Sequence, residues 1–522
     1  MCYNYKRMFI KKTNNVSTMK NGGISAHFSK TLNQIIKSDI STLLIYLRKR
    51  FVFPVKCNLY LCDKEFFISQ KDGKRTYCVF YDNANENRKS YPQIFIPSRQ
   101  SKNNTLREIL FNLLSGLSMY FQWINKDQGT EKSLDEAVDE EASQILEEYE
   151  CYLIARQFKN LRINDVKQSL LKGQGRALAI IKNNPKKYYK LVLYAATHDI
   201  AWDKYSGTHA DYVYEMISAY QNKELFLNAI IGRMSTNTKP FLFGHLTWLL
   251  RCFSFDGSSV AKQALNNTYH QLIEEISHDK ESKDRIIDNF VSICFAITES
   301  FVDFNNVAKD IIHLSKTVSF DVSKIQWFVD SNFDEYKKDI LNDKSSFAYM
   351  LFKMAHVSHK RFAKDFSFKV NSNEQTVENL LQEINTTDKR RKRIIMESLM
   401  DIKNEKIREY ALKHISNNNL YDLLPLLINN ATKEDYELIM EYCQKVEFSF
   451  QSKRWHNVVS AIAMMKDAPV SLFKYVYENS YCSFCRDDVF QKMASRNMLT
   501  KEQVLESHYD CEEAIREISS SL

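Results

Sequence analysis

Glycine and proline are scarce in this chain of 522 residues. It holds 11 Gly and 7 Pro, whereas an average chain of this length would carry roughly 36 and 26. Turns, hairpins and phosphate-binding loops use both residue types, so the scarcity argues against a sheet-rich or dinucleotide-binding protein. Helices joined by short polar segments are the expected alternative, and the length predicts about two to four domains.

Long apolar runs are also missing. Runs such as "NLYLC" and "LPLLI" fall far short of the roughly 20 residues that a membrane span needs. The basic N-terminus "MCYNYKRMFIKKTNNVSTMK" lacks the apolar core of a secretory signal. We therefore expect residues 1–24 to be a disordered basic leader, with Met8 or Met19 as alternative starts. Eleven scattered cysteines without such a signal predict reduced thiols, a cytoplasmic location and no membrane association.

Charge is unevenly distributed. The formal net charge is +8, but residues 131–150 contain nine acids and one Lys, a net of −8, so the remainder carries +16. A basic remainder can attract nucleic acid or an anionic partner. The simpler explanation is a Lys- and Asn-rich composition, because no nucleic-acid-binding motif accompanies the charge.

The spacing of apolar residues predicts a mainly α protein with a small α/β N-terminal domain over residues 25–156. That domain combines a helix over 28–51, a sheet of three or four strands ending near Ser98, a helix from Asn104 or Thr105, and a helix from Leu134 to Arg156. Ser133 and Glu136 have the spacing of a capping box for the last helix. From about residue 170 the pattern is helical throughout, with an irregular helical-repeat region over 170–385 and clearer repeats over 386–522.

The clearer repeats resemble a known architecture. Each unit has an apolar face too large to bury alone, and "NEKIREYALKHI" (residues 404–415) is similar to the second helix of HEAT-type repeats. The resemblance implies an α-α superhelix, a HEAT-like solenoid similar to uncharacterised bacterial HEAT-repeat proteins.

The segment "LREILFNLLSGLSMYFQWINK" (residues 106–126) resembles the active-site helix of bacterial zincin-like metallopeptidases, in which HExxH precedes a similar aromatic run. In that alignment Ser115 and Met119 occupy the two His positions, Gly116 the general-base position, and Asp135 or Glu136 the third-ligand position. Ser115, Gly116 and Met119 cannot bind zinc and activate water, and one remaining acid would not hold the metal on its own. The resemblance therefore implies a pseudoenzyme without cofactor, whose former cleft could bind an extended peptide.

An ordinary core helix is the alternative explanation of the same segment. One helical face carries an adequate apolar stripe, formed by Ile109, Leu113, Leu117, Tyr120 and Ile124.

A zinc site is a second candidate, near the C-terminus. Cys482 and Cys485 form a C-x-x-C pair, and His508 and Cys511 follow, which together make an acceptable zinc ligand set. The alternative is that the cysteines are small residues packed between helices.

Two other clusters of charged residues carry open alternatives. Five cations begin a predicted helix and oppose its dipole: Lys389, Arg390, Arg391, Lys392 and Arg393. They could contact nucleic acid or another anion, or they could simply be solvated. A second cluster could be an unrecognised hydrolytic site or a buried polar network; it contains His198, Asp199, Asp203, His209 and Asp211.

The segment "KGQGRALA" is not a phosphate loop, since it lacks the G-K-[ST] ending and a preceding strand. Gly173 and Gly175 are expected to end one helix and to start another.

The sequence thus predicts a non-catalytic protein-binding scaffold. The alternatives are a nucleic-acid-binding HEAT-like protein that uses a basic face, including Arg361 and Lys364, and a hydrolase with an unrecognised site. Nothing in the residues indicates the partner, the process or the oligomeric state.

Overall fold

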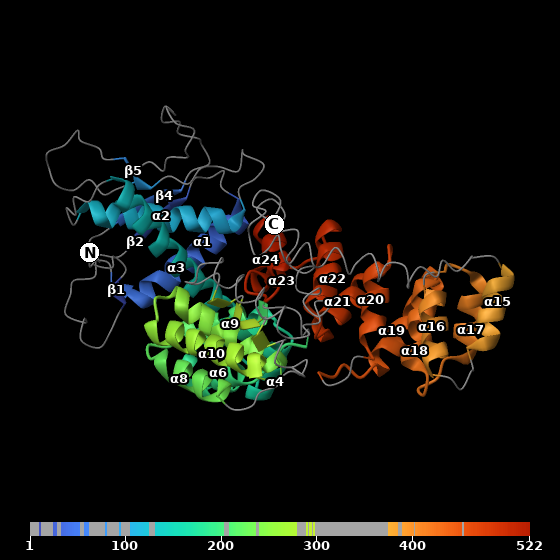
Figure 1. Cartoon of the computed structure of the whole chain (residues 1–522). Coiled ribbons are helices and arrows are strands. Elements are labelled where there is room, and N and C mark those ends of the chain that lie inside the picture. The colour runs from blue at the N-terminus through green and yellow to red at the C-terminus, as the bar shows by residue number, and fades with distance from the viewer. Residues whose placement is uncertain are drawn as a thin grey trace, which may run out of the picture. The chain divides into compact units, whose positions relative to one another are not determined.

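The computed structural model describes a mainly helical chain (Figure 1), as predicted. The described residues are 10–11, 24–28, 33–52, 57–61, 79–80, 93–94, 105–124, 131–202, 208–235, 240–278, 289–290, 292–294, 296–297, 374–384, 389–400, 402–450 and 454–522. The chain divides into two compact units. Unit 1 comprises residues 1–160, 501–508 and 516–522, and unit 2 comprises residues 161–500 and 509–515.

Unit 1 contains short strands and three long helices. The strands are β1 (Ile10–Lys11), β2 (Ile24–Phe28), β3 (Phe51–Val52), β4 (Cys57–Leu61), β5 (Val79–Phe80) and β6 (Gln93–Ile94). The helices are α1 (Gln34–Arg50), α2 (Leu106–Ile124) and α3 (Glu131–Gln157), joined by α23 (Lys501–Ser507) from the C-terminal part of the chain.

The described strands of unit 1 form three two-stranded pairs. β1 pairs with β3 and β5 pairs with β6, both antiparallel, and β2 pairs with β4 in parallel with Ile24 opposite Cys57. The parallel pair is possible because α1 provides the crossover between β2 and β4. The predicted sheet of three or four strands is not present among the described residues, and its expected strand at residues 65–70 lies outside them. β1 falls within the segment 1–24 that was expected to be disordered.

The three long helices of unit 1 share one apolar core. Ile109, Leu113 and Leu117 are buried in it, which confirms this part of the predicted stripe on α2. The side chains of Tyr120 and Ile124 lie outside the described part of the structure. α2 starts after Thr105, whose hydroxyl accepts the Glu108 N–H at 3.3 Å while the Glu108 carboxylate accepts the Thr105 N–H at 2.9 Å. This reciprocal cap confirms the predicted start of the helix.

The predicted start of α3 is wrong. The helix begins at Glu131 instead of Leu134, so Ser133 lies inside it and cannot serve as its N-cap. Glu131 and Lys132 are good helix formers and extend the helix by a turn beyond the capping signal.

The described residues of unit 2 form helices and one 3-10 turn (Figure 1). Its first group contains α4 (Ile163–Leu171), α5 (Gly175–Asn183), α6 (Pro185–Thr197), α7 (Thr208–Ser218), α8 (Glu224–Met234), α9 (Pro240–Phe255) and α10 (Ser259–His278). Its second group contains α15 (Glu374–Glu383), α16 (Lys389–Met400), α17 (Glu405–His414), α18 (Leu420–Asn429), the 3-10 turn η2 (Lys433–Asp435), α19 (Tyr436–Lys445), α20 (His456–Met464), α21 (Val470–Asn479) and α22 (Ser483–Ser495). α24 (Glu513–Ser520) begins in unit 2 and ends in unit 1.

Helices of unit 2 pack on near neighbours in the sequence. α5 contacts α6 and α7, α6 contacts α7 and α8, α18 contacts α19 and α20, and α20 contacts α21 and α22. Packing of each helix on the next one and on the one after it is the pattern of helical repeats, in which neighbours complete each other's core. No helix in the described part of the chain is both long and apolar enough to cross a membrane.

A buried arginine connects distant parts of unit 2. The Arg486 side chain in α22 is fully buried and donates to the carbonyl oxygens of Lys172 and Gly173 after α4. It also donates to the Asp510 carboxylate at 2.5 Å. Arg486 and Gly173 are 313 residues apart in the sequence.

Two glycines end helices in the same way. Gly173 (φ +70°) follows α4 and Gly257 (φ +88°) follows α9. The Gly173 N–H donates to the Leu170 carbonyl, and the N–H of the next residue donates to the Ser169 carbonyl. In the same way, the Gly257 N–H donates to the Ser254 carbonyl, and the N–H after it donates to the Phe253 carbonyl. Both are Schellman caps, which favour glycine because a Cβ is strained at positive φ. Gly175 begins α5, so the predicted roles of Gly173 and Gly175 are confirmed.

The two caps differ in what surrounds them, and this makes a matched pair of variants. Gly257→Ala meets no atom within 4 Å, whereas the new Cβ in Gly173→Ala would collide with the Cys511 thiol. We expect Gly257→Ala to lower the free energy of unfolding by about 1–2 kcal/mol from backbone strain alone. Gly173→Ala should cost about 2 kcal/mol more, because overpacking adds to the strain. Urea unfolding followed by circular dichroism measures the difference, and equal midpoints would contradict it.

Candidate functional site

The zincin-like positions lie on α2 and α3, which pack against each other in unit 1. Ser115 is buried, and its hydroxyl donates to the Asp139 carboxylate of α3 at 2.8 Å. One turn on, the buried Ser118 hydroxyl donates to Glu141 of α3 at 3.0 Å. The first expected His position therefore faces the acidic helix that was expected to supply the third ligand.

The remaining zincin-like positions are only partly described. Gly116 is buried on α2. Met119 also lies on α2, and Asp135 and Glu136 lie on α3, but their side chains are outside the described part of the structure.

The residues at these positions do not fit a zinc ion. A serine hydroxyl that is already bonded to a carboxylate is a poor ligand, and a glycine offers neither a ligand nor a general base. We therefore assign no metal-dependent step to this helix pair.

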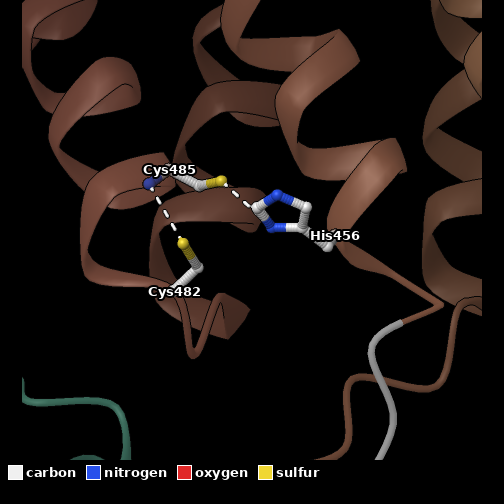
Figure 2. Close-up of side chains that lie close together, drawn as sticks. All are labelled: His456, Cys482 and Cys485. Atoms are coloured by element: carbon white, nitrogen blue, oxygen red, sulfur yellow. Dashed lines mark hydrogen bonds between the residues drawn. The ribbon is translucent and has the colours of Figure 1, made fainter. Parts of the chain in front are cut away.

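A second group of side chains has ligands suited to a metal. Among the described residues, one group of three or more His, Cys, Asp and Glu side chains brings its ligand atoms together: His456, Cys482 and Cys485, all within 4.8 Å of one another. The Cys485 thiol lies 3.4 Å from Nδ1 of His456, and the Cys482 sulfur accepts the Cys485 N–H at 3.5 Å. Figure 2 shows the Cys485 thiol pointing at the imidazole and the Cys482 thiol pointing at the Cys485 backbone.

Helix ends position all three residues of this cysteine–histidine group. Cys482 is the N-cap of α22, Cys485 lies in the first turn of that helix, and His456 is the first residue of α20. A spacing of three residues in a helical turn brings the two cysteines to one face. Both cysteines are buried, and His456 is half-buried.

Hydrogen bonding and burial divide the charge between the two cysteines. The hydrogen bond from the Cys485 thiol, followed in importance by one from His456, lowers the pKa of Cys482 in spite of its burial. The same thiol–thiol hydrogen bond and burial raise the pKa of Cys485. Because the two thiols interact, they titrate as a pair and not independently.

The other two residues of the predicted zinc set have different surroundings. Cys511 is buried in unit 2, 3.8 Å from the Arg486 guanidinium. His508 belongs to unit 1, where its ring contacts the Ser519 carbonyl at 3.2 Å and lies 3.8 Å from the Glu150 carboxylate. Burial lowers the pKa of His508.

His456 was not identified from the sequence, although a signal for it exists. Alternate helices of stacked hairpins run in the same direction, so the N-termini of α20 and α22 lie at one end of the stack. A histidine at the start of α20 can therefore reach a C-x-x-C pair at the start of α22.

The predicted basic run begins α16. The Lys392 ammonium lies 3.3 Å from the Asp422 carboxylate. The side chains of Lys389, Arg390, Arg391 and Arg393 are outside the described residues, as are Arg361 and Lys364.

Members of the predicted polar cluster at residues 198–211 contact separate partners. His198 stacks on Tyr194 with ring centroids 4.2 Å apart, and Asp199 accepts the Ala201 N–H at 3.1 Å. Asp211 accepts the Trp248 indole N–H at 2.7 Å. His209 is buried in α7, and Asp203 lies outside the described residues.

Comparison with known proteins gives no neighbour for this chain: no family model, no curated protein and no solved structure matches it.

If α2 derives from a zincin helix, restoring its ligands should restore zinc binding. We expect Ser115→His with Met119→His to bind about one Zn²⁺ per chain more than the unmodified chain, because an i, i+4 pair brings two imidazoles to one tetrahedral ion. Adding Gly116→Glu should leave that stoichiometry unchanged. Isothermal titration with Zn²⁺ on the folded chain measures it.

Single variants provide the control for this test. Ser115→His alone lacks the second imidazole and should bind this additional ion at least about 100-fold more weakly. A folded double variant with no affinity above that of the single variant would contradict the zincin origin.

Proposed function

We propose that this chain is a non-catalytic scaffold that binds a protein partner through its helical repeats, with a pseudo-metallopeptidase domain at its N-terminus. Two features support the non-catalytic part. Ser115 and Gly116 offer neither a zinc ligand nor a general base, and the Ser115 hydroxyl already bonds Asp139.

Exposed apolar side chains at one end of three consecutive helices carry the proposal of partner binding. Leu225 at the start of α8, Phe255 at the end of α9 and Val260 at the start of α10 are 50%, 56% and 51% exposed. We call these three residues the α8–α10 edge. Apolar residues gathered on a surface cost free energy in water, and such patches are typical of protein-binding sites.

Polar contacts hold the α8–α10 edge in place. Asp256, next to Phe255, accepts from the Lys223 ammonium at 2.8 Å and from the Tyr214 hydroxyl at 2.5 Å. The hydrogen bond from Lys223, followed by that from Tyr214, lowers the pKa of Asp256. The Arg251 guanidinium lies 5.0 Å from the centre of the Phe255 ring. An apolar centre with a polar rim is the usual composition of a protein interface.

The basic run at residues 389–393 supports nucleic-acid binding less strongly than the α8–α10 edge supports binding of a protein. Lys392, the one cation of that run with a described side chain, is close to Asp422, and a neutralised lysine contributes little to phosphate binding.

The proposal is tested by comparing what the full chain and an edge variant capture from cells that express it. We expect one protein to be recovered in near-stoichiometric amount, with the interaction resisting nuclease and about 0.5 M salt because it is mainly apolar. The triple variant Leu225→Ser, Phe255→Ser, Val260→Ser should bind at least about tenfold more weakly, since each lost apolar contact costs about 1 kcal/mol or more.

A matched control removes equally exposed apolar groups elsewhere in unit 2. Ile163 and Val470 are 54% and 42% exposed, and Ile163→Ser with Val470→Ser should leave capture unchanged. If nuclease or moderate salt abolishes capture, the nucleic-acid alternative is favoured. If both variants lose capture equally, the α8–α10 edge is not the binding site.

A further inference from the structure

We propose that His456, Cys482 and Cys485 form a zinc site, with the fourth position of the ion open to water. This site is independent of the α8–α10 edge and of the zincin-like helix pair. It differs from the set that the sequence predicts, because His456 takes the place of His508 and Cys511.

The separations between the ligand atoms are close to those around a tetrahedral ion. Zinc bonds of about 2.3 Å to sulfur and 2.0–2.1 Å to nitrogen place neighbouring ligands roughly 3.4–3.8 Å apart at tetrahedral angles. The Cys485 thiol lies 3.4 Å from the His456 Nδ1, and all three ligand atoms fall within 4.8 Å of one another. A zinc ion can therefore enter with small side-chain rotations.

The start of α22 favours negative charge on the two sulfurs. Cys482 is the N-cap of α22 and Cys485 lies in its first turn, where the unpaired N–H groups and the helix dipole stabilise negative charge. The Cys482 sulfur already accepts the Cys485 N–H at 3.5 Å. Zinc binding would release the protons of the thiols that it coordinates.

Three protein ligands leave one position for solvent. The Ser460 hydroxyl lies 3.6 Å from the Cys485 thiol, and a neutral hydroxyl is a poor zinc ligand. His456 is half-buried, so its side of the group is accessible to water. The ion would link the starts of α20 and α22 and fix their packing.

Zinc content and a cobalt derivative test the site in the unmodified chain. The full chain, purified without chelator and dialysed against Zn²⁺, should retain about one equivalent. Replacement by Co²⁺ should give thiolate-to-metal charge-transfer absorption of two thiolates and the visible bands of a four-coordinate ion. These two measurements do not depend on whether a variant folds.

Single variants identify the ligands. Cys482→Ser, Cys485→Ser and His456→Gln should each weaken zinc binding at least about 100-fold, because each removes one of three protein ligands. The matched controls Cys252→Ser and His270→Gln change the same residue types elsewhere and should retain full binding. His508→Gln and Cys511→Ala should also retain it.

Several results would overturn the assignment. They are a wild-type chain that holds no zinc at micromolar concentration, a cobalt derivative without thiolate charge transfer, and zinc that is lost from His508→Gln or Cys511→Ala as completely as from Cys482→Ser.

Discussion

The buried guanidinium of Arg486 is the contact on which the arrangement of unit 2 depends. A buried charge without partners costs several kcal/mol, so its acceptors must be in place when the unit folds. Those acceptors are the carbonyl oxygens of Lys172 and Gly173 and the carboxylate of Asp510. The turn after α4, the first turn of α22 and the segment before α24 are therefore fixed together. The outermost of these segments are more than 300 residues apart in the sequence. Packing between neighbouring helices alone would not fix their positions relative to one another.

The same contact shapes the cysteine–histidine group. Arg486 follows Cys485 directly in α22, so the bonds that hold its side chain also set the rotation of the helical turn that carries both thiols. Aromatic packing fixes the other side of the group. The rings of Trp202 and Trp455 lie 4.5 Å apart, and Trp202 also lies against His456 with ring centroids separated by 5.3 Å. A geometry suited to a metal thus follows from packing between segments that are distant in the sequence.

Helices were predictable from the sequence because their signals are local. Apolar spacing marks the stripe of Ile109, Leu113 and Leu117 on α2, and Gly173 marks the end of α4. Contacts between distant segments were less accessible. The strand Ile24–Phe28 was missed because it is short and pairs with β4 across the whole of α1. The assignment of residues 501–508 to unit 1 likewise depends on contacts with no local signal.

The candidate sites show the same limit of what a local sequence pattern can reveal. C-x-x-C was visible as a pattern, whereas His456 required knowledge of which helix starts lie together.

The apolar and the polar interpretations of α2 are compatible. The apolar face of α2 is buried in the core, while the Ser115 and Ser118 hydroxyls donate to Asp139 and Glu141 of α3. A core helix needs no polar residues on this side, since buried hydroxyls must each find an acceptor. The hydroxyl–carboxylate bonds of Ser115 and Ser118 supply those acceptors and join α2 to α3.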